Sequence, residues 1–206
     1  MSHLRVDIRQ RAEEVLGLYP RARSAMLPLL HLVQEQDGYL SDEGIAEVAA
    51  LTGTTPADVR GTASFYDMFH LEPVGKFVVG VCTNIACLLA GGEEMLEHAS
   101  SLLGCPVGGT SDDGMFTLEE SECLADCDFA PCVQVNHRYV RATTSDAFDI
   151  LVSDLRASRL DHDVPAHGTL IRVRRSGGLR ASRAEVAAQR AEAQSAREAR
   201  AMKESK

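Results

Sequence analysis

The stretch KFVVGVCTNIAC, residues 76–87, decides the fold of this chain, because an apolar run leads directly into two cysteines. Residues 76–81 combine valine and phenylalanine in the way that is typical of a short buried strand. Cys82 stands at the end of that strand, and Cys87 stands on the loop that follows. Paired thiols on a loop that leaves a strand indicate a metal site at the edge of a sheet.

A second cysteine pair, Cys123 and Cys127, follows after 35 intervening residues, with the spacing CX3C where the first pair has CX4C. Residues 116–122 alternate in a way that predicts a strand ending at Cys123. Since the carboxyl ends of neighbouring parallel strands meet at one edge of a sheet, we expect the two pairs to lie close together. A 2Fe-2S cluster takes four thiolates, two on each iron. The predicted cluster ligands are Cys82, Cys87, Cys123 and Cys127.

Other uses of these cysteines stay open on spacing alone. A structural zinc site also takes four thiolates, although gaps of two residues are more usual for it. A thioredoxin-type redox pair would need CXXC after a strand, and neither pair has it. Disulfides would need an oxidising compartment. Cys105 and Cys132 lie among apolar residues and are expected to be buried structural thiols. Cys132 is close enough to Cys127 to neighbour the cluster or to replace a ligand.

Composition and charge place the chain among ordinary globular proteins. It has 206 residues, of which 45% are hydrophobic and 25% charged, enough for one or two domains. Residues 1–155 carry 9 Lys+Arg against 24 Asp+Glu, whereas residues 156–206 carry 12 against 6. The acidic body disfavours nucleic acid and membrane surfaces as partners. No apolar run suits a signal peptide or a membrane span, so we expect a cytoplasmic protein without direct membrane insertion.

The first 73 residues predict a helical bundle. Apolar residues recur at helical spacing over 6–18, 24–36, 42–51 and 56–65. Gly38 and Gly53 supply stops, while Ser41 and Thr55 supply N-caps, the latter with Asp58 three residues on. The third and fourth of these helices resemble a helix-turn-helix, but a recognition helix needs more basic neighbours than Arg60 alone.

Residues 74–160 predict a compact sheet with helices on it. After the strand at 76–81 we expect a helix over 92–103, the strand at 116–122 and a strand at 132–135 that turns at 136–138 toward a further extended segment. Thr143, with Asp146, is expected to cap a last helix that carries Phe148 and Leu155. Residues 161–206 predict a basic tail, with an edge strand at 169–174 and a segment that is helical or disordered.

With these features placed, the sequence resembles one family over residues 8–156: the small 2Fe-2S subunit of NADH:quinone oxidoreductase, respiratory complex I. The stretches that carry the resemblance are LLHLVQEQDGYL at 29–40, the helix around Val48 and Ala49, FYDMF at 65–69, VGK at 74–76, both cysteine pairs and Ala130–Pro131. The fold implied is mixed, α+β or α/β, with an N-terminal helical bundle and a thioredoxin-like ferredoxin domain. The family's four cluster ligands fall on the four cysteines named above.

The resemblance implies an electron-transfer subunit of a proton-translocating enzyme, with one 2Fe-2S cluster acting as a side acceptor near the FMN. FMN and NADH would be bound mainly by the partner flavin subunit, since this chain has no Gly-rich dinucleotide fingerprint. The large iron-sulfur subunit is a further expected partner, and the complex would hold the chain at the inner face of the cell membrane. Catalysis would belong to the assembly.

Two alternative assignments stay open, and one residue differs from the family pattern. The equivalent subunit of an NAD-linked hydrogenase or formate dehydrogenase would use the same module. A zinc-stapled scaffold or a helix-turn-helix regulator would belong to a different class. Ala125 stands where the family often has glycine, a mild change if the backbone there is not left-handed.

Acidic residues surround the second cysteine pair. They are Glu119, Glu120, Glu122, Asp126 and Asp128. Because reduction makes an anionic cluster more negative, nearby carboxylates oppose it. We therefore expect a strongly reducing cluster whose potential rises when Asp126 or Asp128 is neutralised.

Overall fold

The computed structural model describes residues 2–168 of the chain. The edge strand expected at 169–174 and the basic segment beyond it lie outside the described residues. Within 2–168 the chain forms seven α-helices, two short 3-10 helices and one four-stranded sheet. No helix in this range is long and apolar enough to cross a membrane. Two separate hydrophobic cores organise the fold, one made by helices alone and one made by the sheet with its helices.

The N-terminal helices pack around the first core. They are α1 (Val6–Leu16), η1 (Ala22–Ala25), α2 (Met26–Asp37), α3 (Asp42–Thr52) and α4 (Pro56–Ala63). The expected caps are confirmed: Ser41 Oγ accepts from the Gly44 N–H, and Thr55 forms a reciprocal capping box with Asp58. Gly38 ends α2 in the left-handed conformation, with φ 80°. This conformation is easiest for glycine.

Two of these helices are shorter than the sequence pattern predicts. Helix α1 ends before Gly17, whose freedom as a residue without a Cβ disfavours a further turn. Helix α4 ends at Ala63, and Phe65 is 81% exposed, so this ring does not extend the buried face of the helix as its position suggested.

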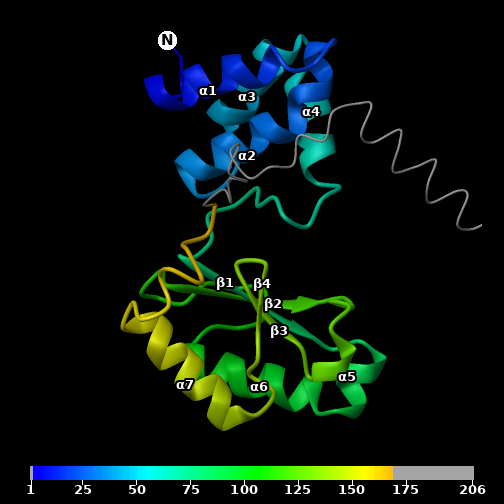
Figure 1. Ribbon diagram of the computed structural model, residues 1–206, viewed down its shortest axis with the longest axis vertical. Helices are drawn as coiled ribbons and strands as arrows, with labels where there is room; N and C mark the ends of the chain where they lie inside the picture. Colours follow the sequence, from blue (N-terminus) through cyan, green and yellow to red (C-terminus); the bar gives the residue numbers. More distant parts are fainter. Residues whose placement is uncertain (1, 169–206) are drawn as a thin grey trace, which may run out of the picture. The chain divides into compact units, whose positions relative to one another are not determined.

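The second core lies beneath a sheet with strand order β2-β1-β3-β4. The strands are β1 (Phe77–Cys82), β2 (Phe116–Ser121), β3 (Val133–Val135) and β4 (Arg138–Val140). Strand β2 runs parallel to β1, with Cys82 opposite Ser121, while β3 is antiparallel to β1 and β4 to β3. Figure 1 shows α6 (Gly92–Leu103) and α7 (Ser145–Arg156) together on one face of this sheet.

Three local features differ from the sequence expectation. A short helix, α5 (Ile85–Leu89), occupies the first cysteine loop, where only a loop was expected. The N-cap of α7 is Thr144 rather than Thr143, because the Thr144 hydroxyl accepts from the Ala147 N–H. Ordered packing also continues past residue 160: Val164 is buried in the second core, and the His167 N–H donates to the Lys76 carbonyl.

Asn136 joins three segments of this part of the fold. Asn136 and His137 form the two-residue turn between β3 and β4, with φ values of 49° and 61°. Positive φ at both positions is typical of a hairpin turn, and Asn is among the residues that adopt it readily. The Asn136 side chain accepts from the Val78 N–H at 2.8 Å and donates to the carbonyls of Lys76 (3.0 Å) and Pro165 (2.8 Å). One amide group thus ties the turn to β1 and to the segment after α7.

We predict that Asn136→Gly lowers the free energy of unfolding by about 2–4 kcal/mol, because glycine keeps the turn but leaves partly buried backbone groups without partners. Urea denaturation of the purified chain measures this loss. His137→Gly is the matched control: it occupies the same turn at positive φ but makes none of these bonds, and it should change stability by less than about 1 kcal/mol. Equal losses in the two variants would contradict this role of Asn136.

Candidate metal centre

The first cysteine pair is buried where β1 passes into α5. Cys82 is the last residue of the strand and Cys87 lies within the short helix, and each is 1% exposed. Asn84 caps α5 by accepting from the Ile85 N–H at 2.9 Å. Cys82 and Cys87, five positions apart, are buried in one cluster with Cys132.

Gly92 allows this loop to pack tightly against the start of α6. A Cβ atom at position 92 would lie 2.7 Å from the Cys82 carbonyl oxygen and 2.9 Å from that of Cys87. Contacts this short are not tolerated, so only glycine fits here. The position of the first pair is therefore fixed on one side by the backbone of the following helix.

The second pair lies at the surface, just beyond the end of β2. Cys123 and Cys127 are both exposed, and their Sγ atoms are 3.9 Å apart. With metal–sulfur bonds of about 2.3 Å and tetrahedral geometry, two thiolates on one metal ion lie about 3.8 Å apart. The second pair is thus spaced for two ligands of a single tetrahedral ion.

The loop between these two cysteines has a strained backbone. Ala125 has φ 61°, in the left-handed region. The condition under which alanine would be a mild replacement for glycine therefore does not hold, and the conformation costs about 1–2 kcal/mol. Two contacts support the loop: the Tyr139 hydroxyl donates to the Leu124 carbonyl at 2.5 Å, and Arg141 pairs with Asp126 at 2.5 Å.

Hydrogen bonds link the two cysteine loops to each other. From the first loop, the Thr83 hydroxyl donates to Glu120 at 2.5 Å and the Asn84 amide donates to Glu122 at 2.9 Å. Both acceptors lie at or just after the end of β2. These carboxylates, which the sequence indicated only as sources of charge, therefore also join the first loop to the strand that leads into the second.

Cys132 forms a second link between the loops. Its backbone N–H donates to Cys87 Sγ at 3.4 Å, and its own thiol donates to the Asp126 carbonyl at 2.9 Å. Cys132 is buried, as expected, and it neighbours the site. Cys105 is also buried but belongs to the core beneath the sheet. The two unpaired cysteines thus differ in position, and only Cys132 contacts the candidate ligands.

The site makes thiolates costly unless a cation accompanies them. Burial raises the pKa of Cys87 to about 12. The hydrogen bond with Cys123 and then the charge of Cys123 raise the pKa of Cys127, with smaller contributions from Cys87 and Cys82. Bound metal would supply the compensating positive charge, because thiolate rather than thiol is the ligand form.

The candidate ligands come as two pairs, one buried and one exposed. Among residues 2–168, no three His, Cys, Asp or Glu side chains are placed to hold one metal ion. A structural zinc ion would need its thiolates around one point, whereas a 2Fe-2S cluster takes two on each of two irons. Two pairs of thiols, one of them with sulfurs 3.9 Å apart, fit the donor set of such a cluster.

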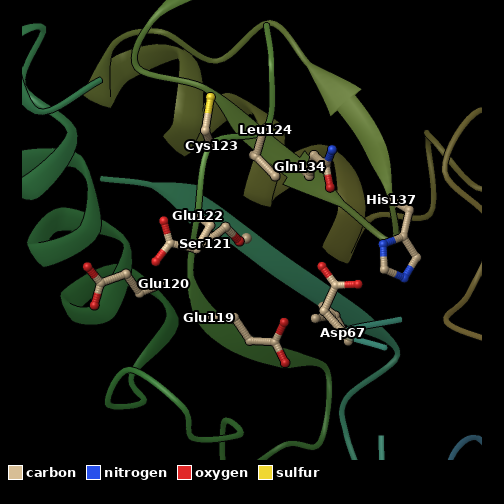
Figure 2. A pocket seen from close by; sticks show the side chains of 11 residues that line it. Asp67, Glu119, Glu120, Ser121, Glu122, Cys123, Leu124, Gln134 and His137 are labelled. Atoms are coloured by element: carbon tan, nitrogen blue, oxygen red, sulfur yellow. The ribbon is translucent and has the colours of Figure 1, made fainter. Parts of the chain in front are cut away.

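An acidic hollow of about 270 Å³ adjoins the second pair. Figure 2 shows Cys123 at one end, Asp67 and His137 at the other, and the carboxylates of Glu119, Glu120 and Glu122 along one side. Burial, followed by the charge of Asp67, raises the pKa of Glu119. Burial, followed by the charge of His137, lowers the pKa of His70, which contacts Glu119 at 3.5 Å. Both shifts favour the uncharged forms of these two side chains.

The four cysteines could be named from the sequence, but the residues that contact their loops could not. The pattern Asn84-Ile85 is an N-cap signal that could have predicted α5. Tyr139 and Arg141 carry no comparable signal, because they reach the second loop through the hairpin of β3 and β4 and stand 15 residues away from Leu124 and Asp126.

Comparison with known proteins agrees with this geometry. Residues 12–156 match the family described as thioredoxin-like 2Fe-2S ferredoxin. An NADH-quinone oxidoreductase subunit of Mycobacterium tuberculosis is 42% identical over 157 residues, which are 76% of this chain and 61% of the relative. NADH-quinone oxidoreductase subunit 2 of Thermus thermophilus is 38% identical over 159 residues, 76% of this chain and 88% of the relative. This chain therefore spans less than two thirds of the mycobacterial proteins.

A solved structure shares the fold. The air-oxidized NAD+-reducing NiFe-hydrogenase superposes with a TM-score of 0.58 at 21% identity, covering 65% of this chain and 23% of that one. At this identity the likeness concerns the fold alone. The mixed helix-and-sheet class predicted from the sequence is confirmed, and the chain belongs to the thioredoxin-like 2Fe-2S ferredoxin family.

Proposed function

We propose that this chain is the 2Fe-2S electron-transfer subunit of an NADH:quinone oxidoreductase. Its cluster would be held by Cys82, Cys87, Cys123 and Cys127. The observation that carries the proposal is the placement of two cysteine pairs after adjacent parallel strands, one pair with sulfurs 3.9 Å apart. The names of relatives at 37–42% identity support the respiratory enzyme as the assembly.

The cluster, when bound, supplies a one-electron acceptor, and the chain's own residues set its surroundings. Cys82 and Cys87 lie in a buried pocket that excludes water from one side of the site. The Cys132 N–H stabilises Cys87 as a thiolate, because a hydrogen bond to the charged form favours that form. Cys123 and Cys127 are exposed, so the second pair marks the side through which an electron can enter or leave.

An apolar surface beside the ligands suits the docking of a partner. Ile85 and Leu89 on α5 are 73% and 85% exposed, and Phe129, two residues after Cys127, is 48% exposed. Exposed apolar side chains grouped around a functional site are typical of interfaces. We propose that the flavin subunit, which would bind FMN and NADH, covers this surface. The large iron-sulfur subunit and a location at the inner face of the cell membrane, reached through the complex, belong to the same proposal.

The same module could serve an NAD-linked hydrogenase or formate dehydrogenase. The hydrogenase likeness at 21% identity supports a common fold only. The relatives' names, by contrast, are those of NADH-quinone oxidoreductase subunits, and they favour the respiratory assignment.

We predict that the anaerobically purified chain is brown and contains about two irons and two sulfides, as a 2Fe-2S cluster requires. Cys87→Ser and Cys123→Ser should each lose most of the iron and the absorption of the cluster, because each removes one thiolate. Metal analysis and electron paramagnetic resonance of the reduced protein measure this. Cys105→Ala, which alters a buried thiol away from the site, should keep full iron content. A colourless native protein that contains zinc would contradict the assignment.

We further predict that the double variant Ile85→Asp, Leu89→Asp weakens binding to the flavin subunit by about tenfold or more, since two exposed apolar contacts would become charged. Calorimetry or a pull-down with the cluster-bearing chain measures the affinity. Val6→Asp is the matched control, because Val6 is 87% exposed on α1. If both variants bind like the native chain while the cluster is intact, the partner docks elsewhere.

A further inference from the structure

The side chain of Arg141 connects the loop of the second cysteine pair to the sheet. Arg141, directly after β4, places Nη1 at 2.5 Å from Asp126 Oδ2. Its guanidinium carbon lies 3.5 Å from the centre of the Phe129 ring. A planar guanidinium can make both contacts at once, one at its edge and one at its face. Arg141 therefore holds the loop at two points, one on each side of Cys127.

The partner of Arg141 belongs to the loop of the second cysteine pair. Asp126 stands between Cys123 and Cys127, and its side chain is 24% exposed. Its carbonyl accepts from the Cys132 thiol, and the Cys132 N–H donates to Cys87 Sγ. Asp126 is thus connected to the first pair as well as to the second.

Arg141 brings a positive charge to the loop of the second cysteine pair. Of the ion pairs formed within residues 2–168, Arg141–Asp126 is the one that includes a residue of the loop between Cys123 and Cys127. The carboxylates of Glu120 and Glu122 nearby accept hydrogen bonds from Thr83 and Asn84, which are neutral side chains. Arg141 therefore places a positive charge near several carboxylates.

We propose that Arg141 is a positioning residue that raises the reduction potential of the cluster by offsetting the charge of Asp126. The inference rests on the proposed function. Reduction adds one electron and so one negative charge, which a nearby cation stabilises and a carboxylate opposes. Without Arg141, the charge of Asp126, the residue directly before Cys127, would be uncompensated. Because Arg141 is 55% exposed, dissolved salt screens its effect, and the effect is largest at low ionic strength.

The test is a redox titration of the cluster-bearing chain at low ionic strength, followed by electron paramagnetic resonance. Arg141→Gln removes the charge and keeps a planar group, and the midpoint potential should shift to more negative values. Arg141→Lys keeps the charge and should stay near the native potential. Asp126→Asn should shift it to more positive values. The double variant Arg141→Gln, Asp126→Asn removes both charges and should return close to native.

The chain offers a matched control. Arg156, at the end of α7, pairs with Asp113 at 2.5 Å and lies over the Phe116 ring at 4.9 Å. Arg156→Gln changes the net charge by the same amount in a similar arrangement, away from the cysteine loops, and should leave the potential unchanged.

The inference is overturned if Arg141→Gln shifts the potential no more than Arg156→Gln does. It is equally overturned if Arg141→Lys shifts it as much as Arg141→Gln, because shape and not charge would then be responsible. Either result, obtained with an intact cluster, leaves the proposed function standing. A native chain that binds zinc or no metal would contradict both the inference and the proposed function.

Discussion

The parallel pairing of β1 with β2 is the constraint on which the site depends. Cys82 lies opposite Ser121 in this pairing, so both strands end at the same level and release their loops side by side. The pairing requires the crossover through α5 and α6, which brings the chain back over one face of the sheet (Figure 1). Because each cysteine loop begins within two residues of its strand, a slip of this register would displace one loop relative to the other.

One cysteine pair of the site is buried and the other is exposed to solvent. Cys82 and Cys87 are buried against Cys132 and the start of α6, while Cys123 and Cys127 are exposed. Deprotonating buried thiols is costly, as the raised pKa of Cys87 indicates, and the second loop holds Ala125 in a left-handed conformation. Bound metal would offset both the deprotonation of the thiols and the strain at Ala125, because metal binding stabilises the folded chain that presents its ligands. Tyr139, Arg141 and Cys132 reduce the remaining freedom of the exposed loop.

The helix caps, the helix ends and the cysteine positions could be predicted from the sequence, because the signals for them are local. The capping box at Thr55 and Asp58, the stop at Gly38 and the cysteines after each strand all act within a few residues. The features that it missed depend on tertiary contacts. Phe65 reads as part of a buried helix face and is exposed, while Val164 lies beyond the expected end of the domain and is buried. The contact of Arg141 with Asp126 joins residues that only the β3–β4 hairpin brings together.

Under the proposed function, the two cysteine pairs hold two irons and not one metal ion. X-ray absorption at the iron edge of the anaerobically purified chain tests it directly. We predict iron surrounded by about four sulfurs, with a second iron as the next neighbour. A metal with four sulfurs but no metal neighbour, or an edge that belongs to zinc, would contradict it.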